Sequence, residues 1–255
     1  MIPFSWDKRI ARAQQLANEY QVTAEILGFY VHVARFQKRV YESLDPDPGC
    51  SLQPTSVRAD FLPFLHLVRT TGPPAIAEEA AKLMRDNIPF EDVLEAWNNA
   101  GESENDADRA AFFARAMLQP FAERLATRNT IPAQSGVASC PFCGEKPVVG
   151  VLRGEGDGGK RWLMCSLCSS EWEFRRLVCP GCAEERNDRL PVYTAAEFDH
   201  VRVEACDTCR AYIKTVDLTK HGLAVPSVDE IATVSLNFWA EENGYKKLKR
   251  NLLGM

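Results

Sequence analysis

Four Cys-x-x-Cys pairs constrain this sequence more than any other feature. Eight of the nine cysteines lie in the segment from Cys140 to Cys209. A short Cys-x-x-Cys loop can present two thiolates to one ion, and two such loops complete a tetrahedral site with four sulfur ligands. The sequence therefore predicts two metal sites. The eight candidate ligands are Cys140, Cys143, Cys165, Cys168, Cys179, Cys182, Cys206 and Cys209.

The four pairs form an internal repeat of two units. The segments between the pairs, 144–164 in the first unit and 183–205 in the second, are nearly equal in length. Both are close to the spacing of a zinc ribbon, in which a β-hairpin joins two Cys-x-x-Cys turns. The simplest partition gives the first two pairs one ion and the last two pairs another. The alternative is an interleaved arrangement of the first and third pairs, but the repeat favours self-sufficient units. Gly144 follows the first pair, where a positive φ is often needed, and no glycine follows the other three.

The spacing does not separate zinc from iron, because a tetrahedral site of four sulfurs accepts either metal. A closed site of four cysteines favours a structural role over a catalytic one, since a catalytic zinc keeps an open position. Redox-active dithiols are the main alternative, because Cys-x-x-Cys can also lower a thiol pKa. Cys50 lies in a Pro- and Gly-containing loop and has no partner nearby in the sequence. His200 and His221 flank the ribbon region, but the cysteines already complete both sites.

The segment 1–130 contains no Cys-x-x-Cys pair and shows helical periodicity throughout. Ser5 or Asp7 can cap the first helix, and Pro120 should kink the last. Six amphipathic segments predict an all-α bundle. The expected helices span residues 7–20, 22–44, 56–70, 74–86, 89–100 and 106–127.

Composition changes after residues 131–136, which we interpret as a linker. Short β-like runs follow it, at 148–152, 161–164, 171–174, 192–193, 201–203 and 212–216. Such short strands cannot bury a core alone, so a bound metal should supply much of their folding energy. After Pro226, Ser227 and Glu230 fit a capping box for a helix that runs to about Asn243, and residues 246–250 form a basic, solvated end.

The sequence thus predicts an α+β multidomain protein. A helical domain (1–133) is followed by a first four-cysteine unit (134–177), a second four-cysteine unit (178–222) and a C-terminal helix and tail (223–255).

Charge and hydropathy argue against two classes of partner. The net charge is −5, and two four-cysteine sites with divalent ions would bring it to about −9. Between Cys140 and Val216 there are 11 Lys or Arg and 12 Asp or Glu, so a nucleic-acid-binding zinc ribbon is the least favoured function. No apolar run of about 18 residues and no signal peptide is present, so we expect no membrane insertion. Paired thiols then point to the reducing cytoplasm.

The order of the four pairs and the segments that follow them resemble the FdhE family of formate dehydrogenase accessory (formation) proteins. The resemblance rests on Cys140-Pro-Phe-Cys-Gly, Cys165-Ser-Leu-Cys, Cys179-Pro-Gly-Cys and Cys206-Asp-Thr-Cys, together with Arg210-Ala-Tyr-Ile-Lys-Thr-Val-Asp and the closing segment from Asp229 to Tyr245. It covers most of the chain and is specific from Cys140 onward.

The resemblance implies an all-α subdomain followed by two rubredoxin-like metal subdomains, with iron or zinc as the two ions. It also implies a cytoplasmic maturation factor that is not an enzyme and that binds the catalytic subunit of formate dehydrogenase before that enzyme is exported or assembled. A redox or iron-handling protein with labile four-cysteine sites is the alternative. The sequence leaves the oligomeric state open.

Overall fold

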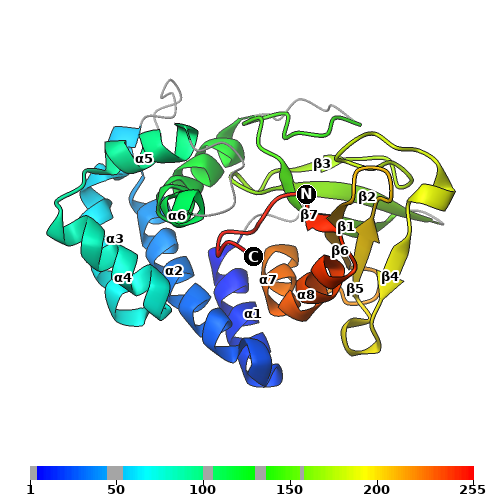
Figure 1. Ribbon diagram of the computed structural model, residues 1–255, viewed down its shortest axis with the longest axis horizontal. Coiled ribbons are helices and arrows are strands. Elements are labelled where there is room, and N and C mark those ends of the chain that lie inside the picture. Colours follow the sequence, from blue (N-terminus) through cyan, green and yellow to red (C-terminus); the bar gives the residue numbers. More distant parts are fainter. Residues whose placement is uncertain (1–4, 45–53, 100–105, 130–135, 156–157) are drawn as a thin grey trace.

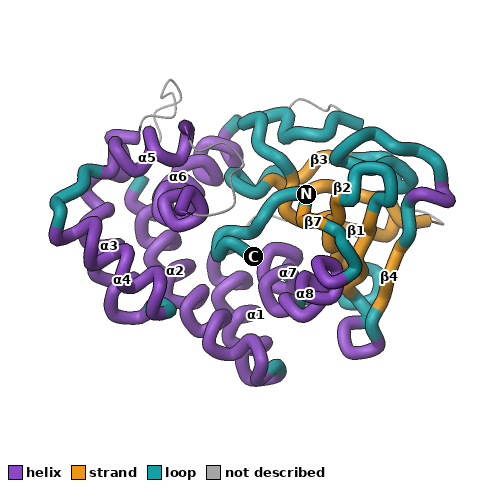
Figure 2. Tube along the Cα trace, viewed as in Figure 1, coloured by secondary structure: helices purple, strands orange, loops and turns teal. Residues whose placement is uncertain are grey.

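A computed structural model describes residues 5–44, 54–99, 106–129, 136–155 and 158–255. Helices form one side of the molecule and a twisted sheet forms the other (Figures 1 and 2). The expected linker, Cys50 and the tip of the hairpin at residues 156–157 fall largely or wholly outside the described residues. Within the described residues, no helix is long and apolar enough to cross a membrane.

All six helices predicted for the first half are present. They are α1 (Trp6–Glu19), α2 (Ala24–Ser43), α3 (Arg58–Thr71), α4 (Pro74–Arg85), α5 (Phe90–Asn99) and α6 (Asp106–Arg128). The Ser5 side chain caps α1 by accepting a hydrogen bond from the Lys8 N–H at 3.4 Å. Helix α4 begins with Pro74, where a missing N–H costs nothing.

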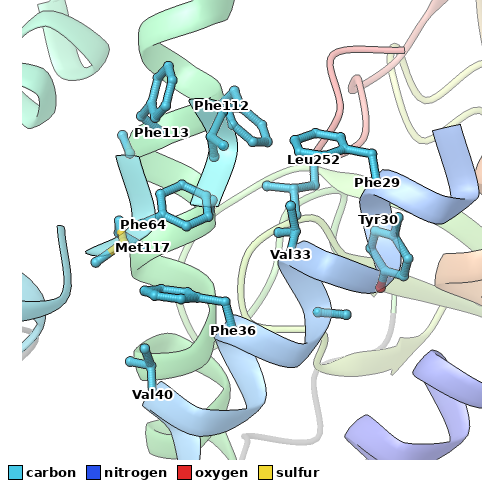
Figure 3. Packing of buried hydrophobic residues seen from close by; sticks show 14 of the residues in the cluster. Phe29, Tyr30, Val33, Phe36, Val40, Phe64, Phe112, Phe113, Met117 and Leu252 are labelled. Carbon is cyan, nitrogen blue, oxygen red and sulfur yellow. The ribbon is translucent and has the colours of Figure 1, made fainter. Parts of the chain in front are cut away.

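Aromatic side chains fill the centre of the helical bundle (Figure 3). Phe64 contacts Phe36, Phe112 and Phe113, with ring centroids 5.0, 5.9 and 6.2 Å away. Leu252, from the last segment of the chain, is buried in the same cluster. The C-terminal segment is therefore part of the helical core.

The second half forms one sheet of seven strands. The strands are β1 (Pro147–Glu155), β2 (Gly158–Cys165), β3 (Glu171–Glu173), β4 (Val192–Thr194), β5 (Val201–Ala205), β6 (Ala211–Asp217) and β7 (Lys246–Lys247). Their order is β3-β2-β1-β6-β5-β4, and β7 pairs with β6. Strands β1–β3 come from the first cysteine unit and β4–β6 from the second.

The two units join through parallel pairing of β1 with β6, a contact that the repeat did not predict. Gly150 lies opposite Thr215 in this pairing, and a Cβ on Gly150 would stand 2.3 Å from the Thr215 Oγ1. The close approach explains the glycine. Pairing also removes two open sheet edges, which three-stranded units would otherwise expose.

The C-terminal segment differs from the prediction in two ways. It forms two helices, α7 (Pro226–Ala232) and α8 (Val234–Glu242), which break at Thr233. The predicted capping box is wrong: Val225 occupies the N-cap position, and its N–H donates to Asp229 at 2.7 Å. Glu230 is instead buried among cationic side chains.

The basic end is solvated only in part: Lys246 and Arg250 are exposed as predicted, but Lys247 is not. Residues 246–247 pair with β6, and the Lys247 side chain is buried against Glu230. Apolar residues of α8 pack on one face of the sheet, whereas α7 reaches the helical core. The opposite sheet face meets α6 through Ala122, Leu163 and Ile213. The sheet thus lies between α6 on one face and the C-terminal helices on the other (Figure 1).

Candidate metal centre

Each Cys-x-x-Cys pair closes a tight backbone turn. In the first turn, the Cys140 N–H donates to the Glu145 carbonyl at 2.8 Å, and the Gly144 N–H donates to the Cys140 carbonyl at 2.9 Å. The third pair repeats both bonds, at 2.9 and 3.0 Å. The repeat seen in the sequence is therefore a repeat of hydrogen bonding.

All four turns use a left-handed residue directly after the second cysteine. The φ angles are +80° at Gly144, +55° at Ser169, +59° at Ala183 and +60° at Arg210. The sequence indicated this geometry only at Gly144. Side chains are uncommon in this region of backbone conformation, so the other three turns are held there by their surroundings.

The structure brings the eight cysteines into the two groups that the simple partition predicts, and not into the interleaved arrangement. Within each group the four sulfur atoms lie within 4.8 Å of one another. In the first group, Sγ–Sγ separations are 3.6 Å for Cys140–Cys168 and 3.4 Å for Cys143–Cys165. In the second group, two separations are each 3.7 Å.

These separations fit a metal ion. A tetrahedron with metal–sulfur bonds of about 2.3 Å has edges of about 3.8 Å. Hydrogen bonds among the thiols of the first group lower the pKa of Cys140 and raise the pKa of Cys165. Four ionised thiols at these distances repel one another, so full ionisation requires a bound cation. Each group could hold one ion, and the donor set is compatible with both zinc and iron.

Backbone N–H groups also point at sulfur, as expected for thiolate ligands. The Leu167 N–H donates to the Cys165 Sγ at 3.4 Å, and the Gly181 N–H donates to the Cys179 Sγ at 3.3 Å. Such donors stabilise the negative charge of a thiolate.

Family models match this half of the chain. The model described as "FdhE, central domain" matches residues 139–176, and the model described as "FdhE, C-terminal domain" matches residues 164–253. The chain belongs to the FdhE family.

Relatives in this family align over different lengths. A protein named "Protein FdhE homolog" from Aquifex aeolicus is 29% identical over 95% of this chain and 93% of its own length. Relatives of the same name from Shewanella sp. and Pseudomonas putida are each 35% identical, but the aligned segments span only 35% and 40% of their lengths. The crystal structure of the FdhE protein from Pseudomonas aeruginosa covers 97% of this chain and 95% of its own, with a TM-score of 0.76 at 23% identity. That similarity establishes the fold, including the helical half.

The first four-cysteine group is tied to the helices. Its second turn offers the Ser166 carbonyl, which accepts hydrogen bonds from Arg115 at 3.2 Å and Gln119 at 3.0 Å. The Ser169 hydroxyl donates to the Glu123 carboxylate at 2.6 Å. Arg9 of α1 bonds both Ser169 and Glu123, at 2.8 and 2.9 Å. Burial raises the pKa of Glu123, although Arg9 partly offsets the effect.

The second four-cysteine group lies nearer the surface. Cys182 and Cys209 are exposed, whereas three of the four cysteines in the first group are buried. Besides the sulfur contacts, a side-chain hydrogen bond links its two turns: the Thr208 hydroxyl donates to Glu184 at 2.5 Å. This bond and the Arg186 N–H lower the pKa of Glu184 to about 2. The two sites therefore share a turn geometry but differ in access to solvent.

The flanking histidines do not join either group. His200 lies 2.9 Å from the buried Asp229, which also pairs with Arg12 of α1 at 2.6 Å. The His221 ring stacks edge-on against His200, with centroids 5.0 Å apart. The sequence analysis did not predict this cluster. A second buried ion pair, between Lys214 and Glu230, did have a signal in the sequence, because Lys214 is a charged residue inside an apolar β run.

Proposed function

We propose that this protein is a cytoplasmic accessory factor for the formation of active formate dehydrogenase, that it is not an enzyme, and that it acts by binding the catalytic subunit. Family membership supports the formation role. The two four-cysteine groups and the sheet that joins them support a rigid binding surface.

The proposal includes two resident metal ions, one ligated by each group of four cysteines. The observation that carries it is the sulfur geometry, with separations of 3.4–3.7 Å and closed sets of four donors. A closed site of four cysteines supplies folding energy and holds its loops in place. The bound ions would fix the turns that shape the surface between the two units.

A pull-down with the dehydrogenase catalytic subunit tests the proposal. Purified wild-type protein should retain the subunit, and Cys179→Ala and Cys206→Ala variants should lose that binding while circular dichroism shows retained helices. A Cys165→Ala variant serves as the contrasting control, because its site packs on α6 and its loss should disturb the fold. If wild-type protein does not bind the subunit, or if deletion of the gene leaves formate dehydrogenase fully active, the proposal fails.

The exposure of Cys182 and Cys209 favours a second candidate function. A labile ion at the second site could serve redox or iron handling during client maturation. Protein purified without added metal would then carry iron that oxygen releases from one site, with a visible absorption that fades. Two zinc ions per chain and a colourless protein would contradict this candidate.

A further inference from the structure

A cavity of about 170 Å³ lies beside the second four-cysteine group. Cys179 and Cys206 form part of its wall. Arg202 and Glu204 also line it, and they alternate along β5 with Val201, Val203 and Ala205, which pack toward α8. The cavity therefore lies on the sheet face that α7 and α8 leave uncovered.

The size and lining of the cavity suit one apolar side chain. An engineered apolar cavity of about 150 Å³ in another protein accepts benzene, so a side chain of the size of leucine or phenylalanine fits here. Val178, Leu190, Ile213 and Leu248 contribute apolar walls. At the rim, Leu177 is 58% exposed and Val192 is 52% exposed. Two of the six large apolar residues that are exposed in the described part of the chain thus border the same cavity.

The cavity lining carries more cationic than anionic side chains. Glu204 is the only carboxylate among the described residues that line it, and it is shared by Arg161 and Arg202, with each nitrogen–oxygen distance 2.6 Å. Arg176 also lines the cavity, and its only hydrogen bond to a described residue goes to the Gly159 carbonyl at 3.3 Å. An exposed guanidinium that has no carboxylate partner in the described part of the chain can bind an external carboxylate.

The neighbouring strand indicates that the occupant is an extended chain. Strand β4 ends the described sheet and has a partner, β5, on one side. The register places Val192 opposite Glu204, and Glu204 opposite Ile213, so these side chains form a row along the cavity floor. A segment that pairs with the open side of β4 would direct alternate side chains to the same face.

We propose that this cavity is a docking site for an extended segment of the client protein, which inserts one apolar side chain beside the second four-cysteine group and places a neighbouring carboxylate against Arg176. The inference rests on the proposed function, because the client supplies the segment. A free small acid would satisfy the charge but could not use the strand edge.

Two surface variants test the site in the full-length, metal-loaded protein. Arg176→Glu reverses the rim charge, and Leu177→Asp removes an exposed apolar contact from a turn. Each should weaken binding of the catalytic subunit, measured by calorimetry, by about tenfold or more. Leu223→Asp is a matched control, because Leu223 also lies in a turn and is 83% exposed but does not line the cavity. Arg69→Glu on α3 controls for charge, and both controls should bind within about twofold of wild type.

The outcomes separate the two proposals. If wild-type protein does not bind the subunit, the proposed function fails. If wild type binds and both cavity variants bind equally well, the docking site is wrong while the proposed function stands.

Competition identifies the segment. Among overlapping acetylated peptides from the catalytic subunit, one should displace the subunit from this protein. Replacing either the apolar residue or the acidic residue of that peptide should abolish the displacement. Displacement by N-acetyl-leucine at the same concentration as the peptide would overturn the extended-chain occupant.

Discussion

Replacing Glu230 with glutamine should destabilise the fold strongly, because this carboxylate is the centre of a buried ionic network. Its side chain is fully buried. It pairs with Lys214 at 3.1 Å and with Lys247, and it accepts a hydrogen bond from Asn251 at 2.7 Å. The network joins β6, α7, β7 and the C-terminal tail, so it links the sheet to the segment that enters the helical core.

The pKa of Glu230 sets the magnitude. Burial alone would raise it, but Lys214, Lys247 and the hydrogen bonds together lower it from 4.5 to about 2. At about 1.4 kcal/mol per pKa unit, the ionised form stabilises the folded state by about 3 kcal/mol. Glu230→Gln leaves the buried Lys214 and Lys247 side chains without a carboxylate. Burial already lowers the pKa of Lys214 to about 7, so this lysine loses its proton readily in the variant, and removing one partner of such a buried pair usually costs about 3–5 kcal/mol. We expect a decrease of about 3 kcal/mol in the free energy of unfolding at pH 7.

The sign of the pH dependence follows from the lowered pKa. The folded protein binds this proton more weakly than the unfolded chain, so the stabilisation is complete above pH 4.5 and is lost as pH falls toward 2. Wild-type and variant stabilities should therefore converge in acid. Urea unfolding followed by tryptophan fluorescence measures both, at equal metal content.

A matched control keeps the measurement specific. Glu242→Gln removes an exposed carboxylate from the end of α8 and should change the urea midpoint little. The predicted stabilisation by the network is wrong if Glu230→Gln unfolds at the wild-type urea midpoint at pH 7. It is also wrong if the difference in free energy of unfolding between the two proteins stays constant down to about pH 3.

Four further outcomes are expected. Gly150→Ala should lower the free energy of unfolding by about 1–3 kcal/mol, because the new methyl group would overlap Thr215 where the two units join, and denaturant titration would detect it. Leu252→Ala should cost about 2–4 kcal/mol and lower the melting temperature, since it empties a buried position in the helical core. Glu123→Ala should cost about 3–5 kcal/mol, because Arg9 would stay buried without its carboxylate, and a wild-type urea midpoint would contradict that contact. A chromogenic chelator should remove metal in two phases, first from the exposed second site, and a single phase would contradict the difference in access.

The periodic parts of the fold were predictable from local sequence. The six helices follow from apolar spacing and from residues such as Ser5 and Pro74, whose effects are confined to one turn of helix. The grouping of the cysteines was predictable because the repeat makes each pair of turns a local unit. The FdhE family was predictable for the same reason, since its signal lies in the order of short segments.

Other features depend on contacts between distant residues, and the sequence did not predict them. The two cysteine units share one sheet because Gly150 allows β1 to approach Thr215 on β6. Glu230 fits the pattern of a capping box, yet burial beside Lys214 and Lys247 outweighs helix capping. Ser169, Ala183 and Arg210 adopt positive φ although only glycine signals that conformation in sequence.

The two four-cysteine groups differ in their contacts, which suggests that the first anchors the sheet to the helices and the second supports the exposed surface. The first group lies between the sheet and α6, where Arg115, Gln119 and Glu123 bond its second turn, so a change there must disturb the helices. The second group has two exposed cysteines and borders the cavity with the exposed apolar rim. Because β1 and β6 are paired, the anchored unit holds the exposed unit in a fixed orientation. A client segment at the cavity would then meet a surface whose position the rest of the chain has already determined, which lowers the entropic cost of binding.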